Sequence, residues 1–184
     1  MADQEEIHRL SLSKYEEDKI LAVRLLEQEF VSLPDKSAAW NDLIILINDR
    51  HLQVSIDASK ALVYAFQFIP EESKSANWNK LAWSLNEWDT DIRRSIDYAI
   101  GSTFRYIPEE YKSAAWDVLH KFLINDFLIL RGDAAYSLSF AFPFIPEENK
   151  STALDDILRL VFDRTPTDGN HIYYKYLGSV EILI

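Results

Sequence analysis

The sequence predicts an all-α fold, a right-handed α-solenoid of about five stacked helical hairpins. Tryptophan recurs at a constant step, at Trp40, Trp78 and Trp116, and Leu154 takes the next place in the series. A Lys-Ser pair precedes each of these positions at the same step, and the 184 residues contain only four glycines and six prolines. A fixed period of this size is typical of helical repeat arrays, and scarce glycine and proline suit helices joined by short turns.

The best-formed unit, residues 107–144, is predicted to be a helical hairpin. It opens with Ile107-Pro108-Glu109-Glu110, where proline suits the first helical position and the acids complement the positive end of the helix. Spacings of i, i+3, i+4 and i+7 on one helix face then join Trp116, Leu119, His120 and Leu123. Asn125-Asp126 supplies a turn. The inner face of the second helix is expected to carry Leu130, Ala134, Leu138, Ala141 and Phe142.

Equivalent positions in the other units repeat this pattern. Small residues recur at Ala61, Ala99 and Ser137, which allows neighbouring second helices to approach closely. Large rings recur at the same step, at Phe66, Phe104 and Phe142, where they fill the space between hairpins. The units therefore share one core, and we expect no single unit to fold alone.

The two ends depart from the period. The chain is interpreted as one domain, 1–184, with an N-terminal cap (1–15, with a short helix in 1–12), repeats (16–163) and a divergent C-terminal half-hairpin (164–184). Residues 171–184 are read as a final helix, although the alternation of Ile172, Tyr174 and Tyr176 also permits a strand. The apolar end Ile182-Leu183-Ile184 either serves homo-oligomerisation or packs back onto the preceding hairpin.

Composition bears on several functions. The net charge of −11 and pI of about 4.8 argue against nucleic acid and anionic membranes as partners, because both attract clustered Lys and Arg. The absence of cysteine excludes disulfides, thiolate metal sites and cysteine nucleophiles. Neither a signal peptide nor an apolar run long enough to span a bilayer is visible, so a soluble cytoplasmic protein is expected.

One unit carries a recognisable series of motifs. It reads Trp78 and Leu81, then Asp89-Thr90-Asp91-Ile92-Arg93, then Tyr98-Ala99 and Phe104 before Ile107-Pro108. This series resembles the HEAT-like repeats of the PBS-lyase type, which occur in tandem in many archaeal proteins. The resemblance covers residues 16–163 and implies the fold, but it says almost nothing about activity. Since Ser55 stands at the position of Arg93, no continuous arginine ladder is expected.

The second helices of such arrays usually line the concave side, so their outward residues are the first candidates for binding. One column contains Lys60, Tyr98, Tyr136 and Tyr174, and the next contains Tyr64, Ser102 and Phe140. Rows of exposed tyrosines suit protein contacts, and nearby arginines can hold a carboxylate or phosphate. The predicted partner-binding residues are Tyr64, Arg93, Arg94, Tyr98, Arg131, Tyr136, Phe140 and Tyr174. The alternative is that the tyrosines pack between repeats and the arginines pair with Asp91 and Asp133.

No catalytic residue, metal ligand or cofactor is predicted. The pairs Glu71-Glu72, Glu109-Glu110 and Glu147-Glu148 are explained by their places at helix starts, and the four histidines lack ligand spacing. No glycine-rich phosphate loop or nucleophile elbow is present. Of the two tryptophans outside the repeated column, Trp88 is favoured over Trp83 as an exposed contact residue.

Three functions are compatible with this pattern. The first is a non-enzymatic interaction module that holds a partner protein or peptide on the concave face. The second is a lyase-like or chaperone-like accessory protein resembling the phycobilin lyases, which share these repeats. The third, a nucleic-acid repair protein of HEAT-like fold, fits the negative charge least well.

Overall fold

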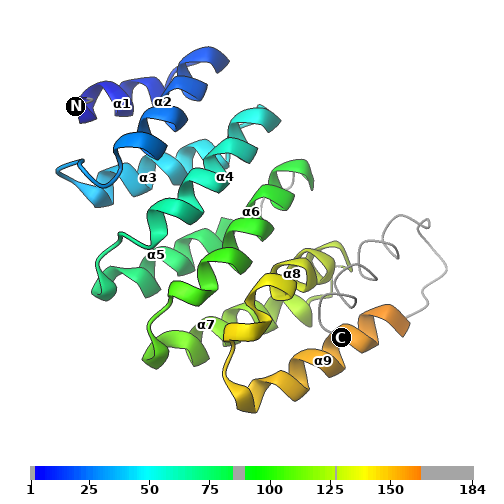
Figure 1. The fold of residues 1–184 in the computed structure, drawn as a ribbon. Coiled ribbons are helices and arrows are strands. Elements are labelled where there is room, and N and C mark those ends of the chain that lie inside the picture. Colours follow the sequence, from blue (N-terminus) through cyan, green and yellow to red (C-terminus); the bar gives the residue numbers. More distant parts are fainter. Residues whose placement is uncertain (1–2, 85–89, 127, 163–184) are drawn as a thin grey trace.

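The computed structural model describes residues 3–84, 90–126 and 128–162. Within these residues the structure has nine α-helices and two short 3-10 helices and contains no strand, as the sequence predicts (Figure 1). The elements are α1 (Gln4–Ser11), α2 (Glu16–Glu29), α3 (Lys36–Ile47), α4 (Leu52–Phe66), α5 (Glu71–Trp83), α6 (Thr90–Thr103), η2 (Phe104–Tyr106), α7 (Glu109–Leu123), α8 (Leu128–Ala141), η3 (Phe142–Phe144) and α9 (Glu147–Phe162). The final segment 171–184, read as helix or strand, lies outside the described residues.

The helices form antiparallel hairpins stacked in two layers (Figure 1). In one layer α2, α4, α6 and α8 contact one another in chain order. In the other layer α1 contacts α3, and α7 contacts both α5 and α9. Contacts such as those between α5 and α6 join the two helices of a hairpin across the layers. We call these the second-helix layer (α2, α4, α6, α8) and the first-helix layer (α1, α3, α5, α7, α9). Each hairpin therefore touches its neighbours in sequence, as expected for a solenoid.

Helix starts follow local chemistry. Asp35 caps α3, because its carboxylate accepts hydrogen bonds from the backbone N–H groups of Ser37 and Ala38. Proline was expected at the first helical position, but Pro108 is instead the residue before α7, which begins at Glu109. In α5, α7 and α9 the first glutamate of the helix also pairs with the lysine three residues later. These pairs are Glu71–Lys74, Glu109–Lys112 and Glu147–Lys150.

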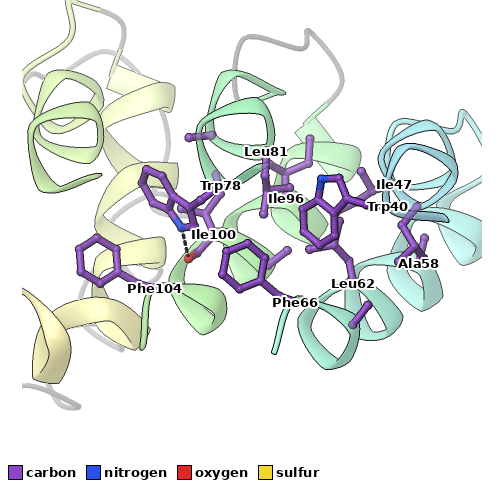
Figure 2. Packing of buried hydrophobic residues seen from close by; sticks show 14 of the residues in the cluster. Trp40, Ile47, Ala58, Leu62, Phe66, Trp78, Leu81, Ile96, Ile100 and Phe104 are labelled. Atoms are coloured by element: carbon purple, nitrogen blue, oxygen red, sulfur yellow. Dashed lines mark hydrogen bonds between the residues drawn. The ribbon is translucent and has the colours of Figure 1, made fainter. Parts of the chain in front are cut away.

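The tryptophan column forms the centre of the core, as predicted. Trp40 and Trp78 are completely buried and Trp116 is buried, whereas Leu154, the fourth member, is 38% exposed. Trp78 donates a hydrogen bond from Nε1 to the carbonyl oxygen of Ile100 at 3.3 Å (Figure 2). Its ring meets Phe104 edge-on at 5.6 Å, so the first helix of a hairpin is fixed to the second.

A short helix precedes the first complete hairpin. This helix, α1, lies within residues 1–12 and buries Ile7 and Leu10 in the shared core. α2 ends at Glu29 and α3 begins at Lys36, which places the shortened turn that the sequence indicates between them. The first-helix layer therefore begins with a short helix, α1, whose outer side is polar.

Candidate protein-contact surface

The outward residues of α4, α6 and α8 lie in parallel stripes. On α6 and η2 the spacing i, i+4, i+7 joins Tyr98, Ser102 and Arg105, of which Tyr98 is half-buried, Ser102 is buried and Arg105 is exposed. Because residues spaced in this way share one side of a helix, equivalent positions in successive hairpins form columns across the second-helix layer. Four columns result: Lys60, Tyr98, Tyr136; Tyr64, Ser102, Phe140; Gln67, Arg105, Pro143; and Phe68, Tyr106, Phe144.

Two of the predicted tyrosines meet at a shared ring. Tyr98 and Tyr136 are both half-buried, and both contact Phe140 nearly perpendicularly, at 5.5 and 5.2 Å between ring centroids. Tyr98 comes from α6, whereas Tyr136 and Phe140 come from α8. The rings thus join neighbouring hairpins while keeping part of their surface exposed, which combines the two sequence interpretations.

Further rings extend this cluster toward the turns between hairpins. Tyr64 is 43% exposed and contacts Phe68 at 5.2 Å. Phe68, Tyr106 and Phe144 are half-buried at equivalent positions of three successive hairpins. We call the whole set the aromatic strip, which consists of Tyr64, Phe68, Tyr98, Tyr106, Tyr136, Phe140 and Phe144.

The predicted arginines do not join this strip as a group. Arg93 is buried, and its Nε lies 3.0 Å from Oδ2 of Asp133 on the next hairpin, so it is unavailable as a surface ligand. A buried guanidinium needs a nearby carboxylate to offset the loss of hydration, which is why the two helices enclose both charges. Arg131 is half-buried. The side chain of Arg94 and the whole of Tyr174 lie outside the described residues.

Arg105 is a candidate that sequence reasoning missed. Its side chain is exposed, and its guanidinium lies 5.3 Å from the ring centre of Tyr106 and 5.9 Å from that of Phe144. Its Nε also donates to the carbonyl oxygen of Ser102 at 3.4 Å. The recurrence of Phe68, Tyr106 and Phe144 at the period of the tryptophans was the signal that could have directed attention to this arginine.

The second-helix layer also contains a small cleft between α2 and α4. Its volume is about 210 Å³, and it is lined by Ile20, Val23, Arg24, Glu27, Asp57 and Lys60. Sites for drug-sized ligands usually measure about 300–1,000 Å³. The cleft is therefore small for a bound organic molecule.

Histidine–aspartate pairs hold the first-helix layer together. Nδ1 of His8 on α1 lies 2.6 Å from Asp42 on α3, and Nε2 of His120 on α7 lies 2.9 Å from Asp156 on α9. Burial raises the pKa of the Asp42 carboxyl, although its bond to His8 acts in the opposite direction. His120 also stacks on Trp116, which makes it a partnered residue between hairpins.

Features expected of other sites are absent from the described part of the chain. In residues 3–84, 90–126 and 128–162, no group of three or more His, Asp or Glu side chains could hold a metal ion. Among the same residues, no helix has the length and apolar character needed to cross a membrane. Trp83 is 63% exposed at the end of α5, and Trp88, which the sequence favoured as a contact residue, lies outside the described residues.

Comparison with solved structures supports the architecture. An engineered protein matches over the whole of this chain and 80% of its own length, with 20% identity and a TM-score of 0.54. The chain is an α-solenoid. A designed armadillo repeat protein in complex with the peptide (KR)4 matches more distantly over the whole of both chains, with 12% identity and a TM-score of 0.39.

Sequence comparisons add no relative. No protein-family model matches the chain. No curated protein matches it either. The solenoid architecture therefore rests on the helices and on the structural similarity, and function has to be argued from the surface.

Proposed function

We propose that this chain is a non-enzymatic interaction module that holds a partner protein or peptide against the outer side of its second-helix layer. The observation that carries the proposal is the aromatic strip, in which Tyr98 and Tyr136 are partly exposed while Phe140 fixes their rings. Rings held in place lose little conformational entropy on binding, and tyrosine offers both apolar area and a hydroxyl group.

The proposal keeps several expectations from the sequence. We take the second-helix layer as the concave side of a HEAT-like array of the PBS-lyase type, forming a single domain over 1–184 in a cytoplasmic protein. The alternative is a lyase-like accessory protein; the cleft between α2 and α4 is by itself small for a tetrapyrrole.

Tyr64 offers a clean test of this surface. Its side chain is 43% exposed on the second-helix layer, and Tyr111 on the first-helix layer is 40% exposed, so the two tyrosines are matched in exposure and in the atoms that alanine removes. The wild type, Tyr64→Ala and Tyr111→Ala are immobilised and incubated with a lysate of the source cells. We expect a retained protein to be lost or reduced about tenfold with Tyr64→Ala alone, which corresponds to a loss of about 1.4 kcal/mol.

The thermal melting temperatures of all three proteins provide the control for folding. Equal retention by Tyr64→Ala and the wild type, or no retained protein at all, would count against a binding role for the strip. A double variant, Tyr98→Ala with Tyr136→Ala, extends the test to the centre of the strip. It is interpreted only against its own melting temperature, because both rings also pack on Phe140.

A further inference from the structure

The chain is strongly acidic, but in the hairpins that follow α2 the exposed acids are unevenly distributed between first and second helices. In the described side chains of α4, α6 and α8 the acidic residues are Asp57, Asp97 and Asp133. Asp97 and Asp133 are buried, the latter beside Arg93, and Asp57 pairs with Lys60 at 3.5 Å. This part of the second-helix layer therefore presents no unmatched carboxylate to solvent among its described residues.

Exposed acids lie on the first-helix layer and, at the N-terminal end of the second-helix layer, on α2 (Glu17 and Glu27). The described first helices expose Glu5, Glu71, Glu72, Glu109, Glu110, Asp117, Glu147, Glu148 and Asp155. A partner rich in carboxylates is repelled there and is tolerated on the outer surface of α4, α6 and α8. The two surfaces thus differ in the sign of the partner that they accept.

Arg105 supplies a positive group within the aromatic strip. Two rings flank its guanidinium, one from its own hairpin and one from the next, and a backbone carbonyl accepts from Nε. These contacts orient the group without neutralising its charge, since they involve rings and a carbonyl rather than a carboxylate. Guanidinium groups fixed in this way bind carboxylates with two parallel hydrogen bonds, and stacking on rings lowers the entropy that binding costs.

We infer that the partner segment is an acidic peptide, one of whose carboxylates binds Arg105 while its apolar or aromatic side chains contact the aromatic strip. This inference rests on the proposed function, and it defines the partner's chemistry. Lys60 on α4 already pairs with Asp57, so this ion pair adds no net positive charge to the surface. One oriented guanidinium suits one carboxylate, whereas a nucleic acid requires many more phosphate contacts.

A random peptide library displayed on phage tests the inference directly. It is selected on the wild type and counter-selected on the Tyr64→Ala variant, so that the sequences kept are those that depend on the strip. We expect them to be enriched in Asp and Glu beside Tyr, Phe, Leu or Pro. Enrichment in Lys and Arg, or no bias in charge, overturns the inference, and in that case the strip itself remains a binding surface.

Three point variants then examine the arginine itself with the selected peptides. Arg105→Gln should weaken binding about tenfold or more, and Arg105→Lys should restore part of the affinity because it keeps the charge. Arg50→Gln is the matched control, since Arg50 is exposed at the turn between α3 and α4 and its removal changes the net charge equally. Equal affinities for Arg105→Gln and Arg50→Gln would overturn the role of Arg105.

The design separates two kinds of failure. If the library yields no peptide that distinguishes the wild type from Tyr64→Ala, the proposed function fails and the inference fails with it. If it yields peptides that need Tyr64 but neither carry acids nor respond to Arg105→Gln, only the inference fails. The salt dependence gives an independent reading, because the difference in affinity between the wild type and Arg105→Gln should shrink as sodium chloride increases.

Discussion

Trp78 and Trp83 lie on the same helix, α5, in opposite surroundings. Trp78 is completely buried, and Trp83 is 63% exposed. We predict that Trp78→Ala lowers the free energy of unfolding by about 3–5 kcal/mol, because the cavity left in the core cannot collapse fully. Trp83→Ala should change it by only about 0.5 kcal/mol. Urea denaturation followed by circular dichroism measures both, and similar losses in the two variants would mean that the tryptophan column is not the core.

Asp49 gives the fold a response to acid. Burial acts to raise the pKa of its carboxyl, but bonds from Lys19 and from the backbone and ring of His51 outweigh burial and hold the pKa below its ordinary value. A carboxyl with a lowered pKa stabilises the fold above its unfolded pKa of about 3.9, and that contribution disappears as the pH falls through the folded pKa.

We therefore predict that Asp49→Asn is less stable than the wild type at neutral pH. The difference should shrink as the pH falls below about 4, since the wild type then loses the contribution that the variant already lacks. Melting temperatures measured at several pH values check this prediction. A difference that stays constant throughout the acid range would show that the ionised carboxylate of Asp49 does not stabilise the fold.

Single side chains show where sequence reasoning was sufficient and where it was not. The period placed Trp40, Trp78 and Trp116 correctly, because a constant step fixes which side of a helix faces the core. For Arg93 the sequence left two alternatives, a surface ligand or a partner of an aspartate, and the structure has the pair with Asp133 on the following hairpin. Arg105 was missed because its orientation also comes from a ring of the following hairpin.

Among the helices, α6 and α8 are in especially close contact, and Gly101 permits this. A Cβ atom added at Gly101 would lie 2.2 Å from the carbonyl oxygen of Ser137 and 2.9 Å from Cβ of Phe140. Since the first of these is a backbone atom, rotation of a side chain cannot relieve the overlap. The helices would have to separate.

We predict that Gly101→Ala destabilises the protein by about 1–3 kcal/mol, the usual cost of forcing extra atoms into a packed interface. At an exposed position in a helix the same substitution would stabilise by about 1 kcal/mol, so the sign of the change is diagnostic. Thermal or urea denaturation supplies the measurement. A stabilised Gly101→Ala variant would contradict the close approach of α6 and α8.

Helix boundaries were predictable where local chemistry defines them. The cap at Asp35 and the paired glutamates at Glu109 and Glu147 mark helix starts in the sequence, and the structure begins helices at or directly after these positions. The position of α9 within the array is clear from its step, but the exposure of Leu154 was not foreseen. A repeated position is buried only when a further layer of residues covers it.

For the whole molecule, the net charge of −11 sets a response to salt. We predict that the free energy of unfolding rises as sodium chloride increases from about 0.05 to about 0.5 M, because repulsion between exposed acids is screened. Replacing Glu72, Glu110 and Glu148 by Gln should flatten this response. A fall in stability with salt would instead show that attraction between exposed charges dominates.

The architecture as a whole was predictable because packing in the core requires similar residues at every repeat. The surface was not predictable, because packing alone does not determine which residues occupy it. The aromatic columns illustrate this difference. Tyr98 and Tyr136 are separated by the same step as the core tryptophans, so the step alone does not distinguish an exposed ring from a buried one. In the structure both rings pack on Phe140 and are half-buried.

The constant step has a consequence for the length of the molecule. If one complete repeat between Trp40 and Trp116 were deleted, the residues on either side of the deletion would occupy equivalent positions of the repeat. Every column of equivalent residues would then continue across the junction. A shortened or lengthened version of this chain would therefore change its reach in whole hairpins. The span of partner that it can hold is adjustable only in discrete increments.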